Sequence, residues 1–167
     1  MKQILLLLLA ALVFTGCKKQ DYDRVDIYLL KSWTQEINTT TNPGLLTISN
    51  AVLEDRPLVS DPEIKTYDHS STSFQLYSEI KPVIAAFGPE KAFAVTLNGT
   101  PVYYGKFHPA YLSSTVIGVA TIDPLLSGDY ELPLRFIHIQ GNAELASLDK
   151  RNHPAIIESF RRSGRLR

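Results

Sequence analysis

The sequence predicts an α+β domain with a mostly antiparallel sheet and two or three short helices packed on one face. Most apolar residues fall in runs of strand length that are separated by turn-forming residues. Two segments instead repeat apolar residues at helical spacing. Asn98-Gly99 stands between two β-rich runs, which is typical of a two-residue hairpin turn. Several short strands with a few short helices indicate the α+β class.

The first elements of the domain are predicted as strands followed by a short helix. Residues 25–30 form a dense apolar run of strand length, and residues 45–53 continue with β-type residues after a turn-forming segment. Ser60-Asp61-Pro62-Glu63 combines a capping residue, a proline and acidic residues, which is typical of a helix start. We expect this helix to run for about two turns, to Tyr67, because turn-forming residues follow.

The middle of the chain predicts a strand, a helix and a hairpin. Residues 73–77 alternate apolar and polar side chains, as a half-buried strand does. An apolar stripe follows at helical spacing, with Ser78 as its expected cap and Gly88-Pro89 as its stop; it consists of Ile80, Val83, Ile84 and Phe87. Residues 92–97 and 100–104 flank Asn98-Gly99 and predict the two strands of the hairpin.

The last part of the chain predicts further strands and a closing helix. Residues 116–122 are rich in β-type residues, and residues 130–139 are expected to form a last strand or pair of strands. The closing helix has Pro154 in its first turn, basic residues in its last turn and Gly164 after it. These signals agree with the rules for helix starts and stops.

The N-terminus has the parts of a bacterial lipoprotein signal. A basic start at Lys2 precedes an apolar run at residues 4–14, and Thr15-Gly16 leads into Cys17, the only cysteine of the chain. A helix of this run is only about 16 Å long, roughly half the thickness of a bilayer's hydrocarbon core. The run therefore predicts a targeting signal and not a transmembrane helix. We expect residues 1–16 to be removed and Cys17 to be lipidated. An ordinary signal peptide with a chance cysteine is the alternative, because Phe14 stands where Leu, Val or Ile is usual.

The rest of the chain is predicted to form one domain behind a short tether. We assign residues 17–24 to the tether and residues 25–167 to a single domain, since about 150 residues make one ordinary core. Without Lys2, 16 basic and 17 acidic residues remain, so no bulk attraction to nucleic acid follows. With Cys17 bound to lipid, no thiol remains for a disulfide or a soft metal site. The predicted location is the bacterial cell envelope, outside the cytoplasm and anchored to the membrane by lipid.

The chemistry-bearing residues predict neither a metal site nor a cofactor. The four histidines are spread along the chain without a zinc-binding spacing; they are His69, His108, His138 and His153. Asp68-His69-Ser70 is interpreted as a loop, because no nucleophile-presenting turn accompanies it. The acidic residues 21, 23 and 26 lack the glycine and glutamate of a calcium loop, and we assign them to the solvated tether.

Five carboxylates leave open an alternative function as a hydrolase. An acid and a base separated by about 5–9 Å would suit glycoside hydrolysis, but nothing in the sequence fixes such a separation. The candidates are Glu36, Glu54, Asp55, Glu63 and Glu79. Our expectation is that the chain is not an enzyme.

Two segments are candidates for binding. Residues 103–114 hold four aromatic rings and a histidine in a segment that Gly105 and Pro109 are expected to interrupt, and aromatic rings give large contact area at low entropy cost. We predict a binding surface for a glycan, peptide or partner protein that consists of Tyr104, Lys106, His108 and Tyr111. The alternative is that half of the rings, such as Tyr103 and Phe107, belong to the core.

The C-terminal segment is the second candidate, because basic residues are concentrated there. Residues 150–167 contain one acidic residue, Glu158, and six basic ones, which are Lys150, Arg151, Arg161, Arg162, Arg165 and Arg167. They could contact anionic lipid headgroups or lipopolysaccharide. Alternatively, they favour the C-terminus of a helix and line an exposed tail.

Six stretches of the chain carry a resemblance to known proteins: FAVTLNG at 93–99, VYYGKF at 102–107, YLSS at 111–114, IDPL at 122–125, DKRN at 149–152 and FRR at 160–162. They resemble a group of small lipoproteins from Bacteroidota-type bacteria, which implies an envelope location and assigns no activity. Residues 57–59 with Ile64, the amphipathic segment and Asn98-Gly99 are weakly similar to the periplasmic head domain of the export protein SecD, over roughly a third of the chain. That likeness implies an α+β topology and protein contacts, although the transmembrane helices of the exporter have no counterpart in this sequence.

Together these patterns predict a membrane-anchored extracytoplasmic lipoprotein that acts as a binding or protein-interaction module. The expected partners are the membrane, through the N-terminal lipid, and an envelope protein or glycan. A hydrolase with unrecognised carboxylates and a purely structural subunit of an envelope assembly are the alternatives.

Overall fold

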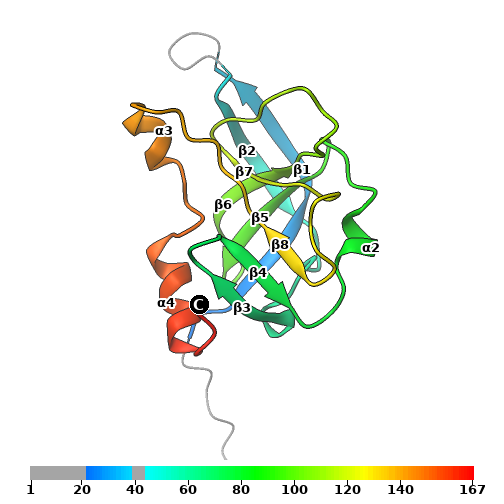
Figure 1. The fold of residues 1–167 in the computed structure, drawn as a ribbon, viewed down its shortest axis with the longest axis vertical. Coiled ribbons are helices and arrows are strands. Elements are labelled where there is room, and N and C mark those ends of the chain that lie inside the picture. The colour runs from blue at the N-terminus through cyan, green and yellow to red at the C-terminus, as the bar shows by residue number, and fades with distance from the viewer. Residues whose placement is uncertain (1–21, 39–43) are drawn as a thin grey trace, which may run out of the picture.

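Two sheets build the domain in a computed structural model, which describes residues 22–38 and 44–167 (Figure 1). The larger sheet has the order β2 (Leu46–Leu53), β1 (Val25–Ile37), β5 (Ala92–Leu97), β6 (Thr100–Phe107) and β7 (Ala120–Ile122). The smaller has the order β3 (Ile64–Asp68), β4 (Ser73–Leu76) and β8 (Glu131–Pro133). All strand pairs are antiparallel except β6 with β7. The predicted α+β class is confirmed.

The helices are short and lie around the sheets. They are η2 (Asp61–Glu63), a single 3₁₀ turn, α2 (Lys81–Ile84), α3 (Ala143–Ser147) and α4 (Pro154–Arg162). Figure 1 shows α3 and α4 along one flank of the molecule and α2 on the opposite side. In the part of the chain that the structure describes, no helix is both long and apolar enough to cross a membrane. The predicted signal at residues 1–16, Cys17 and most of the tether lie outside the described residues.

Strand β1 organises the larger sheet because its two halves pair with different strands. Residues 25–29 pair with β5, and residues 30–37 pair with β2, with register irregularities between Leu30 and Thr34. At the other end of the sheet, Ile117 forms a bridge to Leu45 just before β2, and the Leu46 amide donates to the Ile117 carbonyl at 2.9 Å. The sheet therefore curls until its two edges meet at this point.

The curled sheet has an apolar cluster on each face. One face packs on the smaller sheet, on Ile84 of α2, and on Ile156 and Phe160 of α4. The other face encloses a smaller cluster, which consists of Leu30, Leu46, Ile48, Ala92, Ala94 and Val119. Because neighbouring strand residues point to opposite faces, β5 supplies Phe93 to the first cluster and Ala94 to the second.

The predicted helix from Ser60 to Tyr67 is wrong. Its start is present, since the Glu63 carboxylate accepts a hydrogen bond from the Ser60 amide at 2.7 Å. The helix ends after one 3₁₀ turn because Ile64 and Tyr67 enter β3, where both side chains are fully buried in the larger cluster. Pairing with β4 and burial outweigh the local helix signal.

Other boundaries also differ from the prediction. The middle helix is only four residues long and begins after Ile80, not at Ser78, with Pro82 in its first turn. Strand β7 covers only the end of the predicted run 116–122, and β8 is followed by one bridge, from Thr121 to Arg135, within the predicted run 130–139. The predicted hairpin and closing helix agree with β5, β6 and α4.

A buried ion pair ties the two ends of the domain together. Asp61 Oδ1 lies 2.8 Å from Arg165 Nη2 and accepts the Val25 amide at 3.0 Å. The Asp61 amide in turn donates at 2.8 Å to Asp26, which is buried in β1, so the assignment of Asp26 to a solvated tether is wrong. Arg165 also donates to the carbonyls of Asp61 and Ile64. The start of β1, the η2 turn and the segment after α4 are thus held by one network.

We expect Arg165→Leu to lower the free energy of unfolding by about 3 kcal/mol, because it leaves the Asp61 carboxylate buried without its cation. Urea denaturation measures this. Arg161→Leu is the matched control: Arg161 and its partner Glu158 are exposed, and such a pair contributes ~0–1 kcal/mol. Equal effects of the two substitutions would contradict the role given to the network.

We expect Gly99→Val to destabilise the domain by roughly 1 kcal/mol or more, because both turn residues have positive φ, 49° at Asn98 and 80° at Gly99. A Cβ at Gly99 would meet no atom within 4 Å, so only backbone strain is tested. Gly99→Asn is the control, since Asn tolerates this conformation. A denaturation midpoint that Gly99→Val leaves unchanged would disprove the strain argument.

Candidate functional site

An apolar hollow of the described surface lies between α3 and the curled sheet. It consists of two adjoining apolar pockets of about 220 and 210 Å³ that share Leu148, and we call it the α3 groove. Ligand sites in proteins are commonly concave and mainly apolar, with volumes of about 300–1,000 Å³. Each pocket is smaller than that range, and Leu148 lines both of them.

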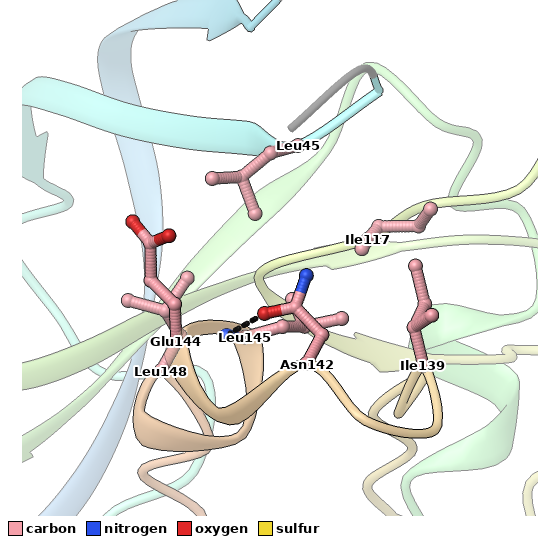
Figure 2. A pocket seen from close by; sticks show the side chains of 7 residues that line it. All are labelled: Leu45, Ile117, Ile139, Asn142, Glu144, Leu145 and Leu148. Carbon is pink, nitrogen blue, oxygen red and sulfur yellow. Dashed lines mark hydrogen bonds between the residues drawn. The ribbon is translucent and has the colours of Figure 1, made fainter. Parts of the chain in front are cut away.

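The outer pocket of the α3 groove is formed where the two edges of the sheet meet. Leu45 projects from the start of β2 and faces Ile117, Ile139 and the side chains of α3 (Figure 2). Asn142 caps α3 by accepting the Leu145 amide at 2.9 Å, which turns the apolar side of this helix toward the pocket. Glu144 lies at the edge of the pocket (Figure 2).

The inner pocket opens toward the smaller core cluster. Its walls come from β2, β6 and the segment before β7, and they include Leu46, Ile48, Tyr104 and Val119. Lys150, which is exposed, supplies a cation to the same pocket. A molecule in the groove would thus contact aliphatic walls in the outer pocket, mixed aliphatic and aromatic walls in the inner pocket, and a positive charge at one place.

One buried residue of α3 and a charged network after it connect this segment to the domain. Leu145 is its only buried residue. Beyond the helix, Arg151 forms a two-point contact with Asp149, with Nε–Oδ1 at 2.9 Å and Nη2–Oδ2 at 2.7 Å, and also donates to Thr72 and to the Leu134 carbonyl. This network fixes the chain where it leaves α3, so the wall of the groove rests on the Asp149–Arg151 pair.

The aromatic segment predicted for binding lies mostly inside the fold. Strand β6 continues through Gly105 to Phe107, so the expectation that Gly105 interrupts the strand is wrong. A Cβ at this glycine would lie 2.2 Å from the Phe93 ring, which explains why a glycine occupies the middle of the strand. Tyr103 and Phe107 are buried in the larger cluster, as the core alternative predicts.

The structure does not gather the four predicted binding residues into one exposed surface. Tyr104 is half-buried and lines the α3 groove, while Lys106 is buried, bonds to Gln35 at 2.7 Å and lies over the Trp33 ring. Burial lowers the pKa of Lys106, and the charge of Glu90 partly opposes this shift.

The other two predicted residues follow β6. One ring nitrogen of His108 lies 2.8 Å from the Ser114 carbonyl oxygen, so the histidine closes a loop, and Tyr111 is exposed. Of the four residues, Tyr104 contributes to the α3 groove.

Two of the carboxylates considered for hydrolysis share a hollow. Glu63 and Glu79 line a common hollow of about 100 Å³, but both are exposed, and their carboxylates accept hydrogen bonds from Ser60 and Tyr130 respectively. Across residues 22–38 and 44–167, no group of three or more His, Cys, Asp or Glu side chains could hold a metal ion.

Two of the six C-terminal basic residues form ion pairs in the interior of the domain. Arg151 and Arg165 are largely buried and paired with Asp149 and Asp61. Lys150 lines the α3 groove. Arg161, Arg162 and Arg167 remain on the surface near the end of α4.

No protein-family model, curated protein or solved structure matches the chain. We therefore infer the function from the geometry of the groove and from the N-terminal sequence.

The sequence patterns predicted neither α3 nor the groove that it lines. The segment carries a usable signal, since Asn142 is a capping residue and Leu145 and Leu148 follow at helical spacing. Its five residues are too few for a clear periodic pattern. The other groove residues come from distant parts of the chain, and no spacing in the sequence connects them.

We expect Asp149→Asn to weaken the acid sensitivity of the domain. Burial alone would raise the pKa of Asp149, but its hydrogen bonds with Arg151 outweigh this and lower the pKa. A carboxyl with a lowered pKa in the folded state stabilises at neutral pH, and the stabilisation is lost as pH falls below about 4. Thermal midpoints measured at pH 7 and pH 3 should therefore differ less in Asp149→Asn than in the wild type. The exposed Asp55→Asn is the control, and an unchanged difference in Asp149→Asn would contradict this role.

Proposed function

We propose that the chain is a membrane-anchored extracytoplasmic lipoprotein of the cell envelope, and that its domain is a binding module whose α3 groove takes one extended aliphatic chain. The observation that carries this proposal is the pair of apolar pockets that share Leu148, next to a short helix with one buried residue. The anchor rests on the N-terminal sequence, in which an apolar run and small residues precede a single cysteine.

An aliphatic chain fits the lining better than a polar ligand does. The outer pocket is lined by Leu45, Ile117, Ile139, Leu145 and Leu148, with Asn142 and Glu144 as the only polar members among the described residues. Burial of methylene groups is favourable by about 0.8 kcal/mol each, whereas a polar ligand without partners would lose free energy on entry. Lys150 suits an anionic head group at the inner pocket. A fatty acid or a lipid with one accessible chain has this combination.

The attachment of α3 is consistent with entry of such a ligand. A helix of five residues with one buried side chain can shift with little loss of packing. The Asp149–Arg151 pair holds the following segment in place, so the helix can move relative to a fixed end.

We expect Leu148→Asp to weaken binding of dansyl-labelled undecanoic acid at least tenfold, because it places a carboxylate between the two pockets. Fluorescence titration measures the binding. Leu126→Asp is the matched control, since Leu126 is also an exposed leucine and lies outside the groove. Both variants should melt within a few degrees of the wild type. Failure of the wild type to bind the probe, or equal loss in the two variants, would refute an aliphatic ligand.

We expect Cys17→Ser to leave the protein unprocessed or soluble, because a single residue supplies the whole lipid anchor. Detergent-phase partitioning of the wild type and the variant tests this, and mass spectrometry of the mature N-terminus identifies the acyl chains. Retention of Cys17→Ser in the membrane fraction after a high-salt wash would show that lipidation is not the anchor.

A further inference from the structure

We propose that the smaller sheet carries a second binding site, which takes a neutral saccharide. The site is a hollow of about 380 Å³, a volume within the range of ligand sites. We call it the tyrosine hollow; its polar and aromatic lining consists of Lys65, Thr66, Gln75, Tyr77, Tyr130 and Arg167. This inference goes beyond the aliphatic ligand proposed for the α3 groove and does not depend on it.

The tyrosine hollow lies on the face of the smaller sheet that points away from the core. Phe74 and Leu76 of β4 are buried in the larger cluster. Because side chains alternate along a strand, Gln75 and Tyr77 point to the opposite face. Figure 1 shows the smaller sheet in front of the larger one. The tyrosine hollow is therefore reached from solvent and shares no lining residue with the α3 groove.

Two exposed tyrosine rings line the hollow, Tyr77 with 64% and Tyr130 with 47% of its surface accessible. Strand pairing places them close together, because the Leu76 amide donates to the Tyr130 carbonyl at 2.8 Å. The Tyr130 hydroxyl donates to the Glu79 carboxylate at 3.0 Å, which fixes the position of its ring. An exposed ring in a hollow offers a flat apolar face to a ligand. A pyranose sugar has flat faces of C–H groups that suit such rings.

Polar groups without partners surround the two rings. Among the described residues, the side chains of Lys65, Gln75 and Tyr77 form no hydrogen bond or ion pair. The hydroxyl oxygen of Thr66 is buried and has no hydrogen-bond partner in the same part of the chain. Buried polar atoms are nearly always paired, so a partner from a ligand would complete this site. These side chains include donors and acceptors, which matches sugar hydroxyls, because each hydroxyl both donates and accepts.

The charges around the tyrosine hollow favour a neutral ligand. Lys65 and Arg167 line it, whereas Glu79, Asp129 and Glu131 lie around one of the two rings. With charges of both signs nearby, the hollow has no field of a single sign that would select an anion or a cation. A neutral saccharide can instead use the charged groups as hydrogen-bond donors and acceptors.

A peptide that binds as an added strand does not suit this place. Recognition of that kind needs a free sheet edge. The edge of β3 is already paired with the C-terminal segment, since Tyr67 forms a bridge to Leu166 and the Arg167 amide donates to the Tyr67 carbonyl at 2.9 Å. The ligand of the tyrosine hollow must therefore bind through the rings and the side-chain polar groups, as a saccharide does.

Affinity electrophoresis in gels that contain a soluble polysaccharide tests the proposal. The full chain is purified in a polyoxyethylene detergent, so that no sugar headgroup competes for the site. The neutral polysaccharides are dextran, glycogen, galactomannan and hydroxyethylcellulose, and polygalacturonate is the anionic comparison. We expect at least one neutral polysaccharide to retard the chain. High salt should leave this retardation unchanged, because salt screens interactions between charges and the ligand has none.

Tyr77→Ala and Tyr130→Ala should each weaken the association at least tenfold, because each removes a ring face from the hollow. Tyr77→Phe keeps the ring and should bind within threefold of the wild type. Tyr111→Ala is the matched control, since Tyr111 is 69% exposed and lies outside the tyrosine hollow. All variants should melt within a few degrees of the wild type, because an exposed ring contributes little to stability.

Leu148→Asp separates the two sites, since it should lose the aliphatic probe and still bind the polysaccharide as the wild type does. Equal losses of polysaccharide binding in Tyr111→Ala and Tyr77→Ala, or a loss in Leu148→Asp that matches theirs, would overturn the assignment to the tyrosine hollow. The absence of retardation by every neutral polysaccharide would overturn the proposal as well. So would retardation by polygalacturonate alone that high salt removes, because it would show binding of an anion.

Discussion

The buried Asp61–Arg165 pair is the interaction on which the arrangement of the domain depends. It joins the η2 turn to the segment after α4, and Asp61 also accepts the amide of Val25, where the first strand begins. A buried charge pair contributes little net stability, but removal of one partner is costly. Its effect is therefore to specify position: the start of β1, the η2 turn and the C-terminal segment have one mutual arrangement that satisfies every buried polar group of the network.

The double pairing of β1 is the second constraint, and it creates the site. Because one half of the strand pairs with β5 and the other with β2, the sheet bends and brings the ends of β2 and β7 together through Leu45 and Ile117. A flat sheet would expose the cluster around Leu46 and Ile48. The curl encloses that cluster, and the inner pocket of the α3 groove, which Leu148 and Lys150 after α3 help to line, reaches it.

Local sequence signals predicted the elements whose structure depends on interactions between residues close in the sequence. Asn98-Gly99 and the closing helix were found because turn chemistry and capping act within a few residues. The helix expected up to Tyr67 failed because burial of Ile64 and Tyr67 depends on distant strands. Most of the candidate site was not predictable for the same reason, since β2, the segment before β7 and α3 meet only in the folded chain.

The aromatic segment shows how composition alone misassigns a site. Its rings suggested a binding loop, but the strand continues through Gly105, so alternate side chains enter the two apolar clusters. Only Tyr104 of the predicted four lines the α3 groove. Leu148, which lines both pockets of the groove, is an ordinary leucine in the sequence. Its importance comes from position: an aliphatic side chain that is partly exposed at a concave surface leaves apolar area that a ligand can cover.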